Sequence, residues 1–257
     1  MKPLQTLAGQ CAVVTNIATP LGYALARRIG MAGAKIFVTG TCNGKTTRAI
    51  ETLSGIGVDV TGNVIDITKE DERKKLIEVV DNEFGKLDSL VINHQQNTVK
   101  GLITDATTKD FNEMCNKYLT SSFDLSNKFY PLLQKSENPS VVLMASITGF
   151  TPFLDVGVYS VVNSGILGLT KTLSQMYGQK NCRVNSVSVG MISEDGSGAI
   201  WDEPNDELRS QLEQLVPLGR VGKIYECTNT VEFLCGRGAM FTTGENFVIN
   251  GGLSVRI

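Results

Sequence analysis

The sequence predicts an α/β fold in which a parallel sheet of about seven strands is covered by helices on both faces. Three observations lead to this prediction. Short apolar runs alternate with longer stretches of helical spacing. The short runs are nearly continuous in apolar character, as in strands that are covered on both sides. Finally, 257 residues with 42% hydrophobic content are enough for a full core. Strand–helix alternation favours right-handed crossovers and a doubly wound sheet.

The predicted strands are short and mostly rich in Val and Ile: Cys11–Thr15, Lys35–Thr39, Asp59–Ile67, Ser89–Asn93, Ser140–Ser146, Arg183–Val189 and Asn246–Asn250. The predicted helices lie between them: Leu21–Met31, Thr46–Ser54, Glu70–Phe84, Asp110–Leu133, Val156–Tyr177 and Ile224–Cys235. The chain shows no internal repeat or linker, so residues 1–257 are predicted to form a single domain. Residues 191–217 are acidic, interrupt the alternation and indicate a variable loop insertion. Ligands of such sheets bind outside the carboxyl ends of the strands.

Composition excludes several classes of partner. A net charge of −2 gives no indication of nucleic acid binding. The chain has no apolar run of the ~20 residues that a membrane span needs, and residues 1–9 lack the apolar core of a signal peptide. The six cysteines are scattered without a C-x-x-C pair, which favours buried small hydrophobes in a reducing compartment. A single histidine, His94, does not suggest a metal site.

The most informative stretch contains Ser146, Tyr159 and Asn163. Its spacing places a serine 13 residues before a tyrosine and an asparagine four residues after that tyrosine, on the same predicted helix. A free tyrosine titrates near ~10 and needs help to act as a base at neutral pH. Asn163 is neutral and does not provide that help.

With these residues, the chain resembles the short-chain dehydrogenase/reductase family, and within it the peroxisomal NADPH-dependent retinol dehydrogenases and carbonyl reductases. Further segments match from end to end: Ala26–Arg28, Gly165–Leu173, Arg183–Asn185, Phe233–Cys235, Thr243–Glu245 and Gly251–Gly252. The resemblance implies a Rossmann-like fold. In the family, the serine polarises the substrate carbonyl and the tyrosine transfers the proton. A lysine at the position of Asn163 lowers the pKa of the tyrosine and holds the nicotinamide ribose.

The loop that binds the cofactor pyrophosphate differs from the family pattern Thr-Gly-x-x-x-Gly-x-Gly. Asn16 and Pro20 replace the first two glycines, and Gly22 keeps the third, whose role is largely structural. Asn16 can adopt left-handed backbone angles, so the turn can persist. Pro20 is tolerated in a first helical turn but removes an N–H from the anion site. We therefore expect a helix start that does not bind phosphate.

Other cofactor positions have also changed. Thr41 stands near the position where NADP-dependent relatives place an arginine for the 2′-phosphate and NAD-dependent relatives place an aspartate for the ribose. Lys45 is a candidate substitute, but a lysine at the start of a helix is more often solvated surface. Asp66 matches the aspartate at the adenine edge, although a carboxylate there can also cap the next helix. Asn93 is kept, but His94 and Gln95 replace small residues that leave room for adenosine. For His94, space filling is favoured over catalysis because it lacks an orienting partner in the sequence.

Two further positions bear on proton transfer and phosphate binding. The family asparagine that organises a relay water aligns with Tyr118, which is larger and is expected to fill the water site. The threonine that donates to the cofactor becomes Glu194. At ~4 Å from a phosphate charge and an effective dielectric near ~20, the repulsion would be about 4 kcal/mol before relaxation.

Three hypotheses follow. The favoured one is a pseudoenzyme: a folded scaffold for binding or structural purposes, with no tightly bound cofactor. The second is a residual NADP-dependent carbonyl or retinoid reductase that uses Ser146, Tyr159 and a displaced cation, Lys100 or Lys45. Lys171 lies too far along its helix. The third is non-redox chemistry in the same cavity with Tyr159 and His94 as proton donors.

The resemblance also bears on assembly and location. The helices Asp110–Leu133 and Val156–Tyr177 are similar to those of the family's dimer interface, which implies a homodimer or homotetramer. A small hydrophobic ligand is a further candidate partner. The end Ser254–Ile257 is similar to a peroxisomal tail, but the small first residue and terminal leucine have changed. We therefore expect a cytoplasmic location, with the peroxisome as the alternative.

Overall fold

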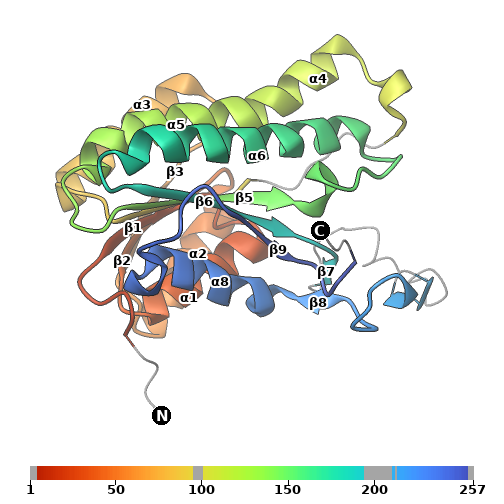
Figure 1. Cartoon of the computed structure of the whole chain (residues 1–257). Helices are drawn as coiled ribbons and strands as arrows, with labels where there is room; N and C mark the ends of the chain where they lie inside the picture. Colours follow the sequence, from red (N-terminus) through yellow and green to blue (C-terminus); the bar gives the residue numbers. More distant parts are fainter. Residues whose placement is uncertain (1–4, 95–100, 194–209, 212, 254–257) are drawn as a thin grey trace.

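The computed structural model describes residues 5–94, 101–193, 210–211 and 213–253. A seven-stranded parallel sheet lies between two layers of helices (Figure 1). The strand order is β3-β2-β1-β4-β5-β6-β9, which confirms the predicted doubly wound fold. The strands of this sheet are β1 (Cys11–Val14), β2 (Lys35–Gly40), β3 (Val60–Val64), β4 (Ser89–Ile92), β5 (Ser140–Ser146), β6 (Arg183–Val189) and β9 (Asn246–Ile249).

The helices divide between the two faces of the sheet (Figure 1). One layer holds α1 (Pro20–Met31), α2 (Asn43–Gly55) and α8 (Ile224–Cys235). The other holds α3 (Glu70–Phe84), α4 (Thr108–Met114), α5 (Ser121–Leu133) and α6 (Gly157–Gly178). A short two-stranded sheet pairs β7 (Ile192–Ser193) with β8 (Gly222–Lys223).

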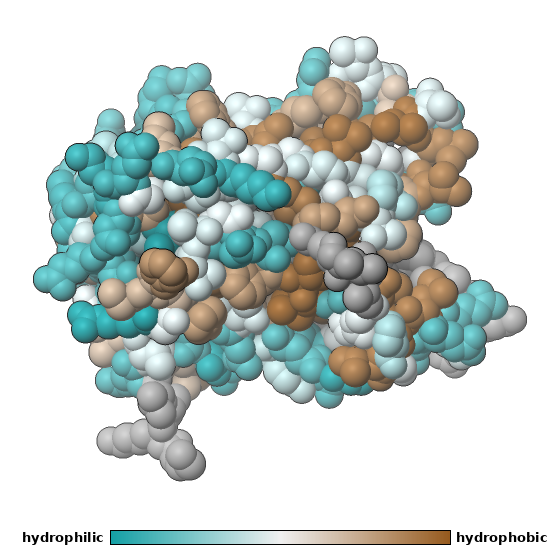
Figure 2. Space-filling model, viewed as in Figure 1, coloured by the Kyte–Doolittle hydropathy of each residue, from teal (hydrophilic) through white to brown (hydrophobic). Residues whose placement is uncertain are grey.

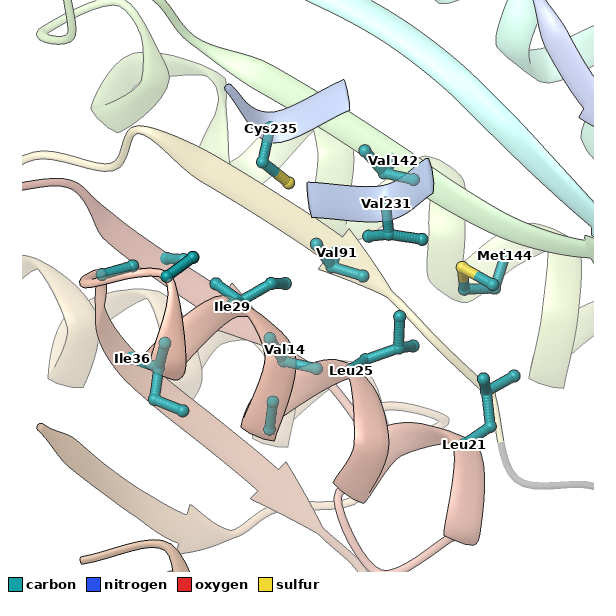
Figure 3. Packing of buried hydrophobic residues seen from close by; sticks show 14 of the residues in the cluster. Val14, Leu21, Leu25, Ile29, Ile36, Val91, Val142, Met144, Val231 and Cys235 are labelled. Carbon is teal, nitrogen blue, oxygen red and sulfur yellow. The ribbon is translucent and has the colours of Figure 1, made fainter. Parts of the chain in front are cut away.

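Two cores follow from the alternation of side chains along each strand. In β1, Val14 packs with the α1 and α8 layer, whereas Val13 packs with the opposite layer. Figure 3 shows the first of these cores, where Leu25 and Ile29 of α1 lie with Val14 and Val231. Of the cysteines predicted to be buried, Cys182, Cys227 and Cys235 are buried, Cys11 and Cys115 are half-buried, and Cys42 is exposed.

The predicted helix Asp110–Leu133 differs most from the structure. It is divided into α4, a π-helical turn at Cys115–Thr120 and α5. Residues 115–120 carry the same helical spacing as their neighbours, so the sequence pattern did not distinguish the wider turn. The predicted strand Asp59–Ile67 is also shorter, because Ile65–Ile67 already belong to the loop into α3.

The chain order creates a switch point at β1. Because β2 and β4 flank this strand, the connections leaving β1 and β4 turn to opposite faces. Their carboxyl ends frame the crevice in which ligands of doubly wound sheets bind. Among the described residues, no helix is both long enough and apolar enough to cross a membrane. The predicted insertion at 191–217 lies largely outside the described residues.

Candidate cofactor and active site

Hydrogen bonds from its own residues and from Asn93 fix the conformation of the loop after β1. Asn16 has a φ of 56°, the left-handed angle that a glycine usually adopts in such a turn. Thr19 caps α1, since its hydroxyl accepts a hydrogen bond of 3.0 Å from the Gly22 N–H. Asn93 donates to the same hydroxyl at 3.0 Å. Pro20 stands at the start of α1 and has no N–H to offer.

Gly22 has a packing role in this loop. A Cβ at this position would lie 2.1 Å from the Asn16 carbonyl oxygen. The Asn93 carbonyl accepts hydrogen bonds from the Thr15 hydroxyl at 2.6 Å and from the Asn16 amide at 2.8 Å. The retained Gly22 and Asn93 therefore hold β1, β4 and α1 together without any ligand.

A small pocket lies at the carboxyl edge of the sheet. It brings together several positions that the sequence indicated, and its lining is Asn16, Thr41, Asp66, Ile67, Thr68, His94 and Lys117. Its empty volume is about 220 Å³ with the open solvent at its mouth included.

Lys117 is the pocket residue that sequence reasoning missed. Burial lowers the pKa of its ammonium group to about 8, and the opposing effect of Asp66 is smaller. The ammonium lies 5.4 Å from the centre of the Tyr118 ring, within the range of a cation–π contact. The available signal was its place directly before Tyr118 on a helix that faces the cleft.

Asp66 serves the turn into α3. Its carboxylate accepts hydrogen bonds from the Thr68 N–H at 3.0 Å and the Thr68 hydroxyl at 2.7 Å. The Lys69 ammonium lies 3.8 Å away, and the Glu72 carboxylate accepts from the Asp66 N–H at 2.6 Å. Of the two interpretations that the sequence left open, the one in which Asp66 organises the helix start agrees with these contacts.

His94 is buried and neutral. Burial, together with the positive charge of Lys117, lowers its pKa to about 3. Its Nε2 lies 3.0 Å from the Ser122 hydroxyl oxygen. That hydroxyl donates to the Tyr118 carbonyl at 2.6 Å, so Nε2 must carry the hydrogen. The ring also lies 4.9 Å from the Tyr118 ring. His94 therefore fills space, and it carries no imidazolium proton to donate at neutral pH.

Tyr118 links this pocket to the catalytic positions. Its side chain is 4% exposed and lies on the π-helical turn, a feature that is frequent at functional sites. The Tyr118 ring contacts the Tyr159 ring edge-to-face, with 5.3 Å between centres. The larger residue thus occupies the region between His94 and Tyr159.

Ser146, Tyr159 and Asn163 come together as their spacing predicts. The Asn163 side-chain oxygen accepts from the Ser146 N–H at 2.8 Å, and its amide donates to the Tyr159 carbonyl at 2.8 Å. The Ser146 hydroxyl oxygen accepts from the Thr148 N–H at 3.2 Å. Burial raises the pKa of the Tyr159 phenol, and hydrogen bonds with the side chains of Ser146 and Asn163 offset only part of the rise. Tyr159 is therefore protonated at neutral pH.

The other candidate groups lie elsewhere. Lys45 is exposed at the start of α2, and Lys171 is exposed on α6. Glu194, Gln95, Lys100 and the Ser254–Ile257 tail lie outside the described residues.

Comparison with known proteins identifies the family. The model described as enoyl-(acyl carrier protein) reductase matches residues 17–254, and dehydrogenase/reductase SDR family member 4 of Oryctolagus cuniculus is 32% identical over 98% of this chain and 96% of its own length. The chain belongs to the short-chain dehydrogenase/reductase family. The Homo sapiens member 4 is 31% identical over 98% of this chain and 90% of its own length. A putative gluconate dehydrogenase from Agrobacterium tumefaciens superposes with a TM-score of 0.92 at 25% identity, covering 98% of this chain and 99% of that one.

Proposed function

We propose that this short-chain dehydrogenase/reductase is a pseudoenzyme, a binding or structural scaffold that does not transfer hydride. The observation that carries the proposal is the position of Asn163. It is 1% exposed, and both ends of its amide hold the backbone beside Ser146 and Tyr159. Its hydrogen bond with the Tyr159 phenol lowers the pKa of that phenol, but by less than burial raises it, and an uncharged amide does not act as the family's cation would.

The retained hydroxyls suit binding better than proton transfer. Ser146 and a protonated Tyr159 can both donate hydrogen bonds to one oxygen atom of a ligand. The hydrogen bonds with Ser146 and Asn163 do not offset the effect of burial on the pKa of Tyr159, so the phenol does not become a base at neutral pH. The pair would therefore hold a carbonyl or hydroxyl oxygen without exchanging its proton.

The surroundings of Tyr159 favour a small apolar ligand. Segment 101–103 lies against the loop before α6, since the Gly101 N–H donates to the Asp155 carbonyl at 2.9 Å. These two segments expose four large hydrophobic side chains: Leu102, Ile103, Phe153 and Leu154. Figure 2 shows brown surface at the upper right of the molecule, where Figure 1 places α4. Exposed apolar side chains on the loop that precedes the helix of Tyr159, together with the two hydroxyl donors, fit a hydrophobic molecule with one polar oxygen.

The cofactor site supports the same proposal. In a nucleotide-binding loop, free N–H groups at the helix start face the pyrophosphate. Here Pro20 removes one of these groups, and the Thr19 hydroxyl accepts from the Gly22 N–H. At Thr41 no charge is available for the ribose or its phosphate. Well-placed contacts must outweigh an association cost of ~4–15 kcal/mol, so several lost contacts weaken affinity severely.

The wild-type protein is therefore expected to bind NAD and NADP, oxidised or reduced, no tighter than about millimolar. Isothermal titration with all four nucleotides measures this directly. Thermal melting is an independent check, because a ligand at ~100 times its dissociation constant stabilises the fold by ~2.7 kcal/mol. A dissociation constant in the micromolar range for any one nucleotide would overturn the pseudoenzyme proposal.

That outcome would favour the second candidate, an NADP-dependent reductase. One observation supports it: Lys117 places a positive charge in the pocket that Asn16, Thr41 and Asp66 also line. The curated relatives are also named as dehydrogenases or reductases. In the third candidate, non-redox catalysis with Tyr159 and His94 as proton donors, the part of His94 is disfavoured because burial lowers its pKa to about 3 and leaves it neutral.

We also propose that the chain assembles as a homodimer or homotetramer through the outer surface of α5 and α6. These helices lie side by side in Figure 1, and the Tyr130 ring of α5 stacks on the Tyr177 ring of α6 with 4.2 Å between ring centres. Their outer faces expose Phe123 at 52%, Val161 at 43% and Met176 at 52%. Large side chains of this kind are usually covered when they gather on one surface.

Phe123→Glu is expected to weaken this association at least tenfold, about 1.4 kcal/mol, because it places a charge in an apolar contact. Light scattering after size exclusion measures the molar mass against the 27.8 kDa chain. Ile56→Glu is the matched control, since Ile56 is 47% exposed at the end of α2 in the opposite layer. Equal mass for wild type and both variants would exclude this interface.

A further inference from the structure

We propose that Lys117, Tyr118 and His94 form an internal plug that occupies the adenosine half of the nucleotide cleft. This inference rests on the proposed function and adds a physical cause for it: the chain's own side chains occupy the ligand's place. The plug is separate from the altered phosphate loop, which concerns the pyrophosphate half of a dinucleotide.

The position of the pocket supports the first step. Its lining includes Asn16 after β1, Thr41 after β2, Asp66 after β3 and His94 after β4. Four adjacent strands therefore point their carboxyl ends at it, as expected for the ligand crevice of a doubly wound sheet. Lys117 reaches this same pocket from the helical layer above the sheet. The cation thus stands inside the crevice and not on the outer surface.

The plug is built into the protein interior. The Tyr118 ring lies between His94, with 4.9 Å between ring centres, and Tyr159, with 5.3 Å. Ser122 fixes His94 by a 3.0 Å hydrogen bond, and the Lys117 ammonium lies over the Tyr118 ring. His94 and Tyr118 are 5% and 4% exposed. Tertiary contacts of this kind hold His94 and Tyr118 in place, and Lys117 lies over the ring of its neighbour Tyr118.

The three side chains come from two elements whose local structure directs them inward. His94 follows β4, and Lys117 and Tyr118 are consecutive residues of the π-helical turn. In a regular α-helix, consecutive side chains point about 100° apart. Here Lys117 lines the pocket while the next residue packs into the core beside it. The turn therefore brings two bulky side chains to the edge of one cleft.

The test uses adenosine, which has no phosphate and so does not depend on the loop at Pro20. The plug is removed by the double variant Lys117→Ala/Tyr118→Ala. The control is Lys109→Ala/Phe111→Ala, which removes an ammonium and an aromatic ring from exposed positions on α4. We expect adenosine to bind the plug variant at least about tenfold more tightly than wild type, as measured by isothermal titration and ligand-observed magnetic resonance, and the control to behave as wild type.

A folded plug variant, verified by circular dichroism, that binds adenosine no better than wild type would overturn the proposal. If the double variant does not fold, Lys117→Ala alone decides the matter, since it removes the half-buried amine and keeps the buried ring. A gain of at least about threefold supports the plug, and no gain overturns it. Failure here would leave the pseudoenzyme proposal standing, which depends on the wild-type titration with NAD and NADP.

Discussion

Acidification from pH 7 to pH 4 is expected to lower the free energy of unfolding of the wild-type protein by about 3 kcal/mol more than that of a His94→Gln variant. The reason is the buried imidazole. Burial, with a further contribution from the positive charge of Lys117, lowers the pKa of His94 from 6.5 to about 3. Glutamine keeps an N–H donor for Ser122 and does not titrate.

The direction of this pH effect on the free energy of unfolding follows from proton binding in the folded and unfolded states. Between pH 6.5 and pH 3 the unfolded chain binds a proton at His94 while the folded chain does not. Stability therefore decreases as the pH falls through this range, and the effect is absent above it. One pKa unit corresponds to ~1.36 kcal/mol, so about 2.5 units at pH 4 give roughly 3 kcal/mol. Carboxylates titrate in both proteins, so their effect cancels in the comparison.

Urea unfolding at pH 7, 5.5 and 4 measures the difference between the two proteins. The gap is expected to be close to zero at pH 7, apart from a constant offset due to the substitution, and to widen at each lower pH. A constant gap across the series would show that His94 accepts a proton in the folded state and is not enclosed by Tyr118 and Ser122.

The sequence was sufficient for the fold because burial on both faces leaves a strong pattern. Val13 and Val14 are both fully buried, on opposite faces of β1, and such strands read as continuous apolar runs. The family spacing also predicted that Ser146 and Tyr159 come together, since one ends a strand and the other lies in the first turn of a packed helix. These are local or repetitive features.

The contents of the cleft were harder to predict. The inward position of Lys117 depends on the π-helical turn, which leaves no distinct period in the sequence. The tautomer of His94 depends on Ser122, which is 28 residues away, and its charge depends on burial and on Lys117. The sequence identified Asn163 as a lost cation, but not the two hydrogen bonds that give its amide a structural role. Such properties depend on contacts in the folded protein, and the periodicity of the sequence describes each helix or strand only by itself.

Asn163→Lys is expected to destabilise the fold by about 1–3 kcal/mol without restoring carbonyl reduction. Asn163 is buried, and its side-chain oxygen accepts from the Ser146 N–H at 2.8 Å. Lysine has no acceptor, so this N–H loses its partner, a change that typically costs ~1–3 kcal/mol. Thermal and urea unfolding measure the loss. Thr172→Lys, which adds the same side chain at an exposed position of α6, is expected to change stability by less than about 0.5 kcal/mol.

The expected lack of carbonyl reduction in Asn163→Lys depends on the cofactor site. A lysine beside Tyr159 would recover acid–base help, which is usually worth ~10²–10⁴-fold in rate. That factor acts only on a bound cofactor, and Pro20, the capped start of α1 and the small pocket at His94 and Lys117 are unchanged in the variant. NADPH consumption with a panel of ketones and retinal should therefore remain at background. Clear turnover by Asn163→Lys would mean that the cleft admits NADPH, and that the missing lysine alone separates this chain from an active reductase.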